Sequence, residues 1–167
     1  MFLDLFQMIT AAKIQMRPLI PNQTRAVLLA VLILTSGAGC KVRLISDYDE
    51  ITDTSATQLQ KKVEGFVHKM VSLAGTPAGT FTQNAAFYDE ARTDLSAIRV
   101  RAKAFEKNDL TIQEIDLVQK GIDDLQALHK IGGDRGLRSA VADPALSALN
   151  TQFTALIKLE LAKKRGQ

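Results

Sequence analysis

The sequence of 167 residues contains a single cysteine, Cys40, and only two histidines, His68 and His129. One thiol cannot form an intramolecular disulfide, so the chain has to fold without that cross-link. It also excludes the paired cysteines beside a histidine that attach haem covalently. Neither histidine has a second histidine or a cysteine at a metal-ligand spacing, and we expect both to be partly exposed structural side chains. The sequence therefore predicts no metal site and no cofactor.

The common catalytic motifs are missing as well. Serines such as Ser72 and Ser139 stand in no nucleophile-elbow sequence, and the glycines around Gly133 do not form a phosphate loop. Asp123 and Asp124 are adjacent, so on a helix their side chains point about 100° apart and do not form a pair of catalytic carboxylates. The sequence predicts no catalytic residue, and we expect a protein that is not an enzyme.

The main apolar run, residues 26–34 (AVLLAVLIL), is too short to cross a membrane comfortably. Its nine residues would form a helix that covers less than half of a hydrocarbon core about 30 Å thick. The basic residues Arg17 and Arg25 precede the run, and the small residues 35–39 (TSGAG) follow it, which is the order of a secretory signal. We therefore expect an export signal, and an uncleaved single-pass membrane helix is the alternative.

Cys40 directly follows the small residues Ala38 and Gly39. This junction resembles the lipobox of bacterial lipoprotein signal peptides, although Gly37 stands where that family usually has leucine. The resemblance implies that residues 1–39 are removed and that Cys40 is diacylated and becomes the mature N-terminus. Cys40 is thus the one site residue that we predict. A buried free thiol is the alternative role of an unpaired cysteine.

The resemblance also implies a location. Lipid on Cys40 would anchor the protein in a membrane and hold it at the periplasmic face of a cell envelope. Aspartate after the cysteine tends to retain such proteins at the inner membrane, so Lys41 favours the outer membrane in a host that has two. The leader is long for a signal peptide, and we expect the natural start at Met16 or Met8.

The part of the chain after the leader is nearly neutral. Removal of 39 residues from 167 leaves 128, which is enough for one domain with a single hydrophobic core. The whole chain has 21 basic and 18 acidic side chains, and the leader holds three of the basic ones and one acidic one. The remaining 18 basic and 17 acidic side chains give a formal net charge of +1. A strongly basic net charge would be the main support for nucleic-acid binding, and this part of the chain lacks it.

After a tether at residues 40–46, four segments within residues 47–167 repeat apolar residues at spacings of three and four, as amphipathic helices do. The expected buried stripes are Ala56, Leu59, Val63, Phe66, Met70 and Leu73; Ala85, Tyr88, Ala91, Leu95, Ile98, Ala102 and Phe105; Ile115, Val118, Ile122, Leu125 and Leu128; and Leu146, Leu149, Phe153, Leu156 or Ile157, and Glu160. Breaks at 75–79, 106–110 and 131–136 separate them. The sequence predicts an all-α, antiparallel, up-and-down four-helix bundle.

Two helix starts carry local signals. Thr111 and Glu114 have the spacing of a capping box, which predicts a helix that begins after Thr111. Asp143 followed by Pro144 predicts another start, with residues 137–142 as a short helical lead-in.

Charge predicts how two of these helices pair. Basic residues end the second helix and acidic residues line the third, namely Arg99, Arg101, Lys103 and Lys107 against Glu114, Asp116, Asp123 and Asp124. Antiparallel neighbours would bring them together, with each exposed pair worth at most about 1 kcal/mol. An anionic-lipid or polyanion site at the basic end is the alternative. The acidic run 47–53 (DYDEITD) lacks the glycine and the final glutamate of an EF-hand, so we expect a helix start there rather than a calcium site.

The region after Cys40, with LISDYDEITD at 44–53 and LIKLELAKKR at 156–165, resembles small helical lipoproteins of proteobacteria, a resemblance that implies no activity. The function that we expect is a membrane-anchored, non-enzymatic binding or scaffold module that contacts another envelope protein. A small-molecule carrier with a cavity between the helices is the alternative, because Ala56, Ala85, Ala91 and Ala102 are small core residues. The sequence leaves the identity of the partner and the oligomeric state open.

Overall fold

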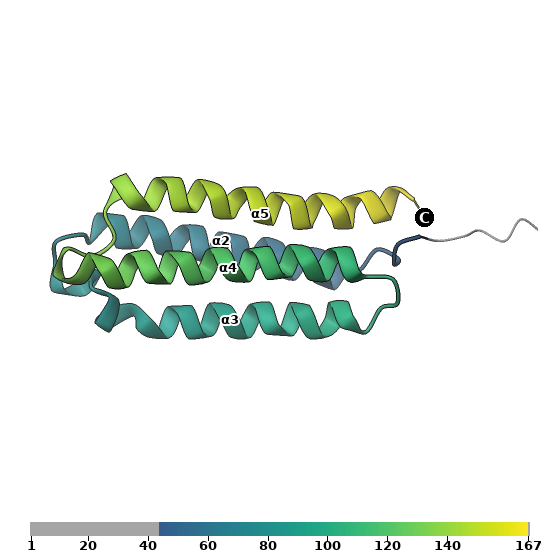
Figure 1. The fold of residues 1–167 in the computed structure, drawn as a ribbon, viewed down its shortest axis with the longest axis horizontal. Coiled ribbons are helices and arrows are strands. Elements are labelled where there is room, and N and C mark those ends of the chain that lie inside the picture. Colours follow the sequence, from purple (N-terminus) through teal and green to yellow (C-terminus); the bar gives the residue numbers. More distant parts are fainter. Residues whose placement is uncertain (1–43, 167) are drawn as a thin grey trace, which may run out of the picture. The chain divides into compact units, whose positions relative to one another are not determined.

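A computed structural model describes residues 44–166, which form four long α-helices and two short 3-10 turns (Figure 1). The helices are α2 (Glu50–Ser72), α3 (Phe81–Lys103), α4 (Asp109–Gly132) and α5 (Ser139–Arg165), and the turns are η1 (Pro77–Gly79) and η2 (Gly133–Arg135). The signal-like segment and Cys40 lie outside the described residues.

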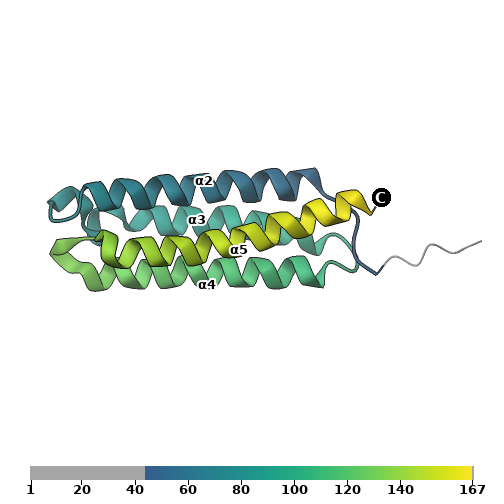
Figure 2. The same cartoon turned by 90° about the horizontal axis from the view of Figure 1, so that it is seen from above.

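Each helix packs against two others and runs antiparallel to the next one in the chain (Figures 1 and 2). Helix α2 contacts α3 and α5, and α4 also contacts α3 and α5, so the contacts form a closed ring. This arrangement confirms the predicted all-α, up-and-down four-helix bundle. The turns η1 and η2 contact each other at one end, which we name the turn end. Residues 44–49, the link between α3 and α4, and the end of α5 lie together at the other end, which we name the terminal end (Figures 1 and 2).

The predicted stripes form most of the core, but the register differs on α2 and at the end of α4, where His129 is buried in place of Leu128. Val67 is fully buried, whereas Phe66 is only partly buried and stacks on Phe87 of α3, with the ring centroids 3.6 Å apart. Because the helix has 3.6 residues per turn, Val63, Val67 and Met70 lie on one face of it. The predicted choice of Phe66 in place of Val67 fits the same periodicity.

The predicted capping box at the start of α4 is wrong. Helix α4 begins at Asp109, and the N–H of Ile112 donates to the carbonyl oxygen of Asn108 at 3.2 Å. Thr111 lies inside the first turn and is completely buried, and its hydroxyl donates to Glu160 of α5 at 2.9 Å. The threonine forms a bond across the core instead of capping its own helix.

The predicted start of the last helix is also wrong. Helix α5 begins at Ser139, five residues before Pro144, so residues 139–142 belong to the helix itself. Pro144 has no N–H for the carbonyl oxygen four residues earlier, which removes one hydrogen bond from the second turn. The helix starts early all the same, because Leu137 and Ala142 are fully buried and hold this part of the chain against the core.

A close backbone contact joins the two links at the turn end. The N–H of Gly75 donates to the carbonyl oxygen of Arg135 at 3.0 Å. Gly136 has φ of 63°, and a Cβ atom there would lie 2.6 Å from the carbonyl oxygen of Gly79. Only glycine allows both this backbone conformation and this approach. The turn end is therefore a fixed structure of two interlocked links.

Candidate functional site

The predicted site residue, Cys40, lies outside the described residues, but the structure shows how the chain after it is attached to the bundle. Ser46 is buried, and its N–H donates to the carbonyl oxygen of Lys107 at 3.0 Å. Its hydroxyl donates to Oδ1 of Asn108 at 2.7 Å. Both partners belong to the link between α3 and α4. The chain is therefore fixed to the terminal end from Ser46 onward.

Asp49 makes the second attachment, as the N-cap of α2. Its Oδ2 accepts from the N–H of Thr52 at 3.2 Å and from the Thr52 hydroxyl at 2.6 Å. Both carboxylate oxygens also accept from the guanidinium of Arg101 on α3, at 2.5 and 2.7 Å. The Arg101 guanidinium, aided by Thr52, lowers the pKa of Asp49 to about 2. The prediction that this acidic run marks a helix start is confirmed.

Replacement of Asp49 by asparagine tests this ion pair through its pH dependence. The pKa of Asp49 falls from 3.8 to about 2 on folding, so the stabilisation is complete above about pH 4 and is lost as the pH falls toward 2. The Arg101 side chain is 38% exposed, and screening by water limits the contribution to about 1–2 kcal/mol. We expect urea unfolding to show wild type more stable than Asp49→Asn by this amount at pH 7, with most of the difference lost by about pH 2. A difference that does not change between those pH values would contradict the assignment.

A buried polar cluster lies behind the attachment, between α4 and α5. The ammonium of Lys163 donates to Oδ1 of Asn108 at 2.6 Å, to the hydroxyl oxygen of Thr111 at 2.7 Å and to Oε1 of Glu160 at 2.5 Å. The three acceptors match its three donors. The amide of Asn108 donates in turn to the carbonyl oxygen of Ala102 at 2.8 Å. The cluster therefore ties α5 to α4 and to the link that holds Ser46.

This cluster was not predicted, although one signal for it was present. Glu160 continues the apolar stripe of α5, and the sequence placed it on the core face without a partner. The predicted stripe ended at Glu160 and did not include Lys163, although the Lys163 side chain is only 2% exposed. Oε2 of Glu160 is buried and has no hydrogen-bond partner among the described residues. The pair thus leaves one carboxylate oxygen unsatisfied in the core, which makes its lysine partner important for stability.

The two histidines have different surroundings. His68 is exposed, with its Nε2 atom 3.7 Å from Oε1 of Glu64, as predicted for a structural surface residue. His129 is completely buried, so the expectation of partial exposure is wrong for it. Its Nε2 lies 2.9 Å from the carbonyl oxygen of Gly79, and its Nδ1 lies 3.0 Å from the hydroxyl of Tyr88. A carbonyl only accepts, so Nε2 carries a proton and donates to Gly79, while Nδ1 shares the second hydrogen bond with the hydroxyl of Tyr88. His129 thereby ties α3 and the turn η1 to α4.

The predicted charge pairing of α3 and α4 is confirmed in part. Arg99 pairs with Asp116, and Arg92, which was not in the predicted set, pairs with Asp123 at 2.7 Å. Arg101 instead binds Asp49 at the start of α2. Asp124 pairs within its own helix, with Lys120 at 2.6 Å. The basic end of α3 is thus used largely for contacts within the bundle.

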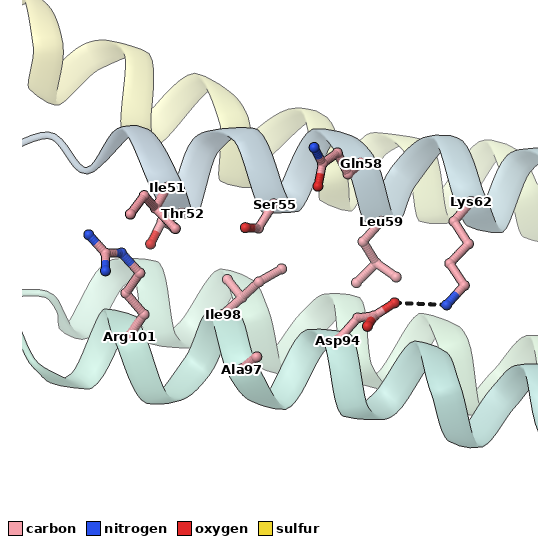
Figure 3. A pocket seen from close by; sticks show the side chains of 10 residues that line it. All are labelled: Ile51, Thr52, Ser55, Gln58, Leu59, Lys62, Asp94, Ala97, Ile98 and Arg101. Atoms are coloured by element: carbon pink, nitrogen blue, oxygen red, sulfur yellow. Dashed lines mark hydrogen bonds and ion pairs between the residues drawn. The ribbon is translucent and has the colours of Figure 1, made fainter.

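A groove of about 500 Å³ runs between α2 and α3 (Figure 3). Leu59 and Ile98 are buried in its floor, and the short side chains of Ser55 and Ala97 leave space between the helices. Lys62, on its rim, donates to Asp94 at 2.9 Å (Figure 3). The charges that border the groove are paired with each other or with Asp49 and Glu90, so an uncharged or apolar group suits it better than an ion.

Comparison with protein-family models, with curated proteins and with solved structures gives no match. Among residues 44–166, no helix has the length and apolar character needed to cross a membrane. In the same residues, no three histidine, cysteine, aspartate or glutamate side chains are grouped so that they could hold a metal ion. A functional assignment therefore has to rest on the residues of this chain.

Proposed function

We propose that the protein is a lipid-anchored, non-enzymatic binding or scaffold module at the periplasmic face of a bacterial envelope. Its proposed location is the outer membrane in a host that has two membranes. The observation that carries this proposal is the position of Cys40, which ends a signal-like segment and precedes buried Ser46 by six residues. A lipid at Cys40 would be joined by a short chain to a bundle that holds residue 46 by two hydrogen bonds. The anchor would therefore fix the bundle close to the membrane.

The groove between α2 and α3 supports the binding part of the proposal. It lies on the side of the bundle, between two helices that also contact the remaining helices of the ring. Its apolar floor and paired rim charges suit a side chain or a helix from a partner protein. A small-molecule carrier is the second candidate, because the volume of about 500 Å³ falls within the range of roughly 300–1,000 Å³ of ligand sites. Native mass spectrometry that finds a retained ligand would favour the carrier.

The Cys40→Ser variant tests the anchor. We expect wild-type protein to lose residues 1–39, to gain the mass of acyl chains and to sediment with membranes. The variant should leave the membrane fraction but unfold at the same urea concentration, since position 40 lies before the bundle. Fractionation and intact mass measure both results. Ser46→Ala is the matched control, because it alters the tether but keeps Cys40, and we expect it to stay with membranes.

Two outcomes would contradict the proposal. A purified native protein that keeps its leader and an unmodified thiol would exclude the lipid anchor and favour an uncleaved membrane helix. A lipidated protein that crosslinks to no specific envelope protein in cells would remove the binding part and leave only the anchor.

A further inference from the structure

The exposed apolar side chains of the described residues gather at the terminal end. Eight large apolar residues between 44 and 166 are at least 40% exposed, and five of them lie at this end: Leu44, Ile51, Val100, Leu110 and Leu161. The most exposed of them is Leu44, at 83%. The other three are distributed elsewhere, with Leu117 inside α4 and both Ile131 and Val141 near the turn end. We name the five residues at the terminal end the apolar rim.

The rim surrounds the end of the bundle because the tether and all four helices contribute to it. Ile51 and Leu110 are the second residues of α2 and α4, Val100 lies three residues before the end of α3, and Leu161 lies four residues before the end of α5. At about 1.5 Å per residue, these four side chains lie within about 6 Å of their helix termini. Figures 1 and 2 show that these termini meet at one end of the bundle.

The charged side chains of this end are balanced. Among residues 44–166, exposed bases and acids occur at this end in equal number, namely Lys103, Lys107, Lys164 and Arg165 against Asp47, Glu50, Glu106 and Asp109. The ammonium of Lys164 lies 5.0 Å from the centre of the Tyr48 ring. Aromatic rings and long cationic side chains are both common at the boundary of a bilayer, where an apolar part and a polar tip are each solvated. Apolar contact, rather than net charge, would therefore govern an interaction of this surface.

The length of the chain between Cys40 and Leu44 indicates what covers the apolar rim. Leu44 follows Cys40 by four residues, and four residues of extended chain reach at most about 14 Å. We infer that the terminal end rests on the surface of the lipid bilayer, with the apolar rim at the boundary between headgroups and acyl chains. This inference depends on the lipid anchor proposed above. The inference also specifies an orientation, in which the terminal end faces the membrane and the turn end points away from it.

Site-specific fluorescence tests the orientation. Leu110→Cys in the rim and Ile131→Cys near the turn end place a thiol at two exposed positions, while the sulfur of Cys40 is blocked by its lipid. Each protein, purified from membranes with its native processing, is labelled with an environment-sensitive dye and placed in vesicles of phosphatidylethanolamine and phosphatidylglycerol that contain spin-labelled lipid. We expect blue-shifted emission and several-fold stronger quenching by the lipid at position 110 than at 131. Leu161→Cys serves as the rim position if labelling at 110 disturbs α4.

The outcomes separate the orientation from the anchor. Intact mass of the same preparation reports acylation. Acylated protein with equal, water-like emission at both positions would overturn the orientation alone. A blue shift at 110 without quenching by lipid would show that protein covers the rim, and it would also overturn the inference. A chain without acyl chains would overturn the anchor and, with it, the orientation.

Discussion

The Lys163→Met variant is expected to lose about 3–5 kcal/mol of unfolding free energy, because a buried carboxylate would remain without its counter-charge. The Lys163 and Glu160 side chains are 2% and 1% exposed, and their N–O distance is 2.5 Å. Without the lysine, Glu160 keeps a single bond, from the hydroxyl of Thr111. Asn108 would also lose a donor to its Oδ1 atom. Urea unfolding at pH 7 measures the loss.

The double variant Glu160→Leu with Lys163→Met tests whether stability depends on Lys163 itself or only on each buried charge having its partner. Removing both charges removes the desolvation cost of each, so we expect the double variant to recover most of the stability that the single variant loses. Lys120→Met is the matched control, because Lys120 and Asp124 form an exposed pair on α4. We expect that control to change stability by less than about 1 kcal/mol. If Lys163→Met cost no more than Lys120→Met, the buried pair would have no special role.

The same periodicity that predicted the fold also contains the positions that were missed. On α4, the buried positions Thr111, Ile115, Val118, Ile122, Leu125 and His129 follow spacings of four and three without a break. On α5, Ala142, Leu146, Leu149, Phe153, Leu156, Glu160 and Lys163 do the same. The sequence interpretation left out the polar positions Thr111, His129 and Lys163 at the ends of these stripes, although the helices and their core faces continue there.

Helical periodicity does not reveal which residues on different helices contact each other. Thr111 and Lys163 are 52 positions apart, and His129 and Gly79 are 50 apart, so no spacing along one helix reveals these contacts. The helix-start signals at Thr111 and Asp143 failed for a related reason. Thr111 bonds across the core, and buried residues hold the chain before Pro144 in a helix, so packing outweighed the local preferences. Cys40 stays a prediction, since it lies outside the described residues.

The two ends of the bundle are built alike, with an apolar middle between two buried polar groups. Lys163 and its acceptors occupy the terminal end, and His129 with Tyr88 occupies the turn end. Polar groups that must find specific partners disfavour a helix shifted by one turn, because the shift would leave them unsatisfied. We interpret these two groups as the features that fix the register of α3, α4 and α5, since their bonds join residues of those helices.

The turn end provides the second large effect, in the variant His129→Leu. Leucine would leave the hydroxyl of Tyr88 and the carbonyl oxygen of Gly79 without the bonds that His129 now makes. Each unsatisfied buried group costs about 1–3 kcal/mol, so the two groups together predict a loss of about 2–6 kcal/mol. Tyr88→Phe should cost less, about 1–3 kcal/mol, because it leaves only Nδ1 of His129 without its hydrogen-bond partner. Urea unfolding at pH 7 measures both.

His68→Leu is the control for the loss of an imidazole alone, because His68 is exposed on α2. We expect it to change stability by no more than about 0.5 kcal/mol. Equal effects of His129→Leu and His68→Leu would contradict the role of the buried ring. Because the bond to Gly79 holds the turn η1, hydrogen exchange of residues 75–80 should accelerate more in His129→Leu than exchange at the start of α2. A uniform acceleration over the whole bundle would instead mean that the histidine contributes only to global stability and does not fix the turn.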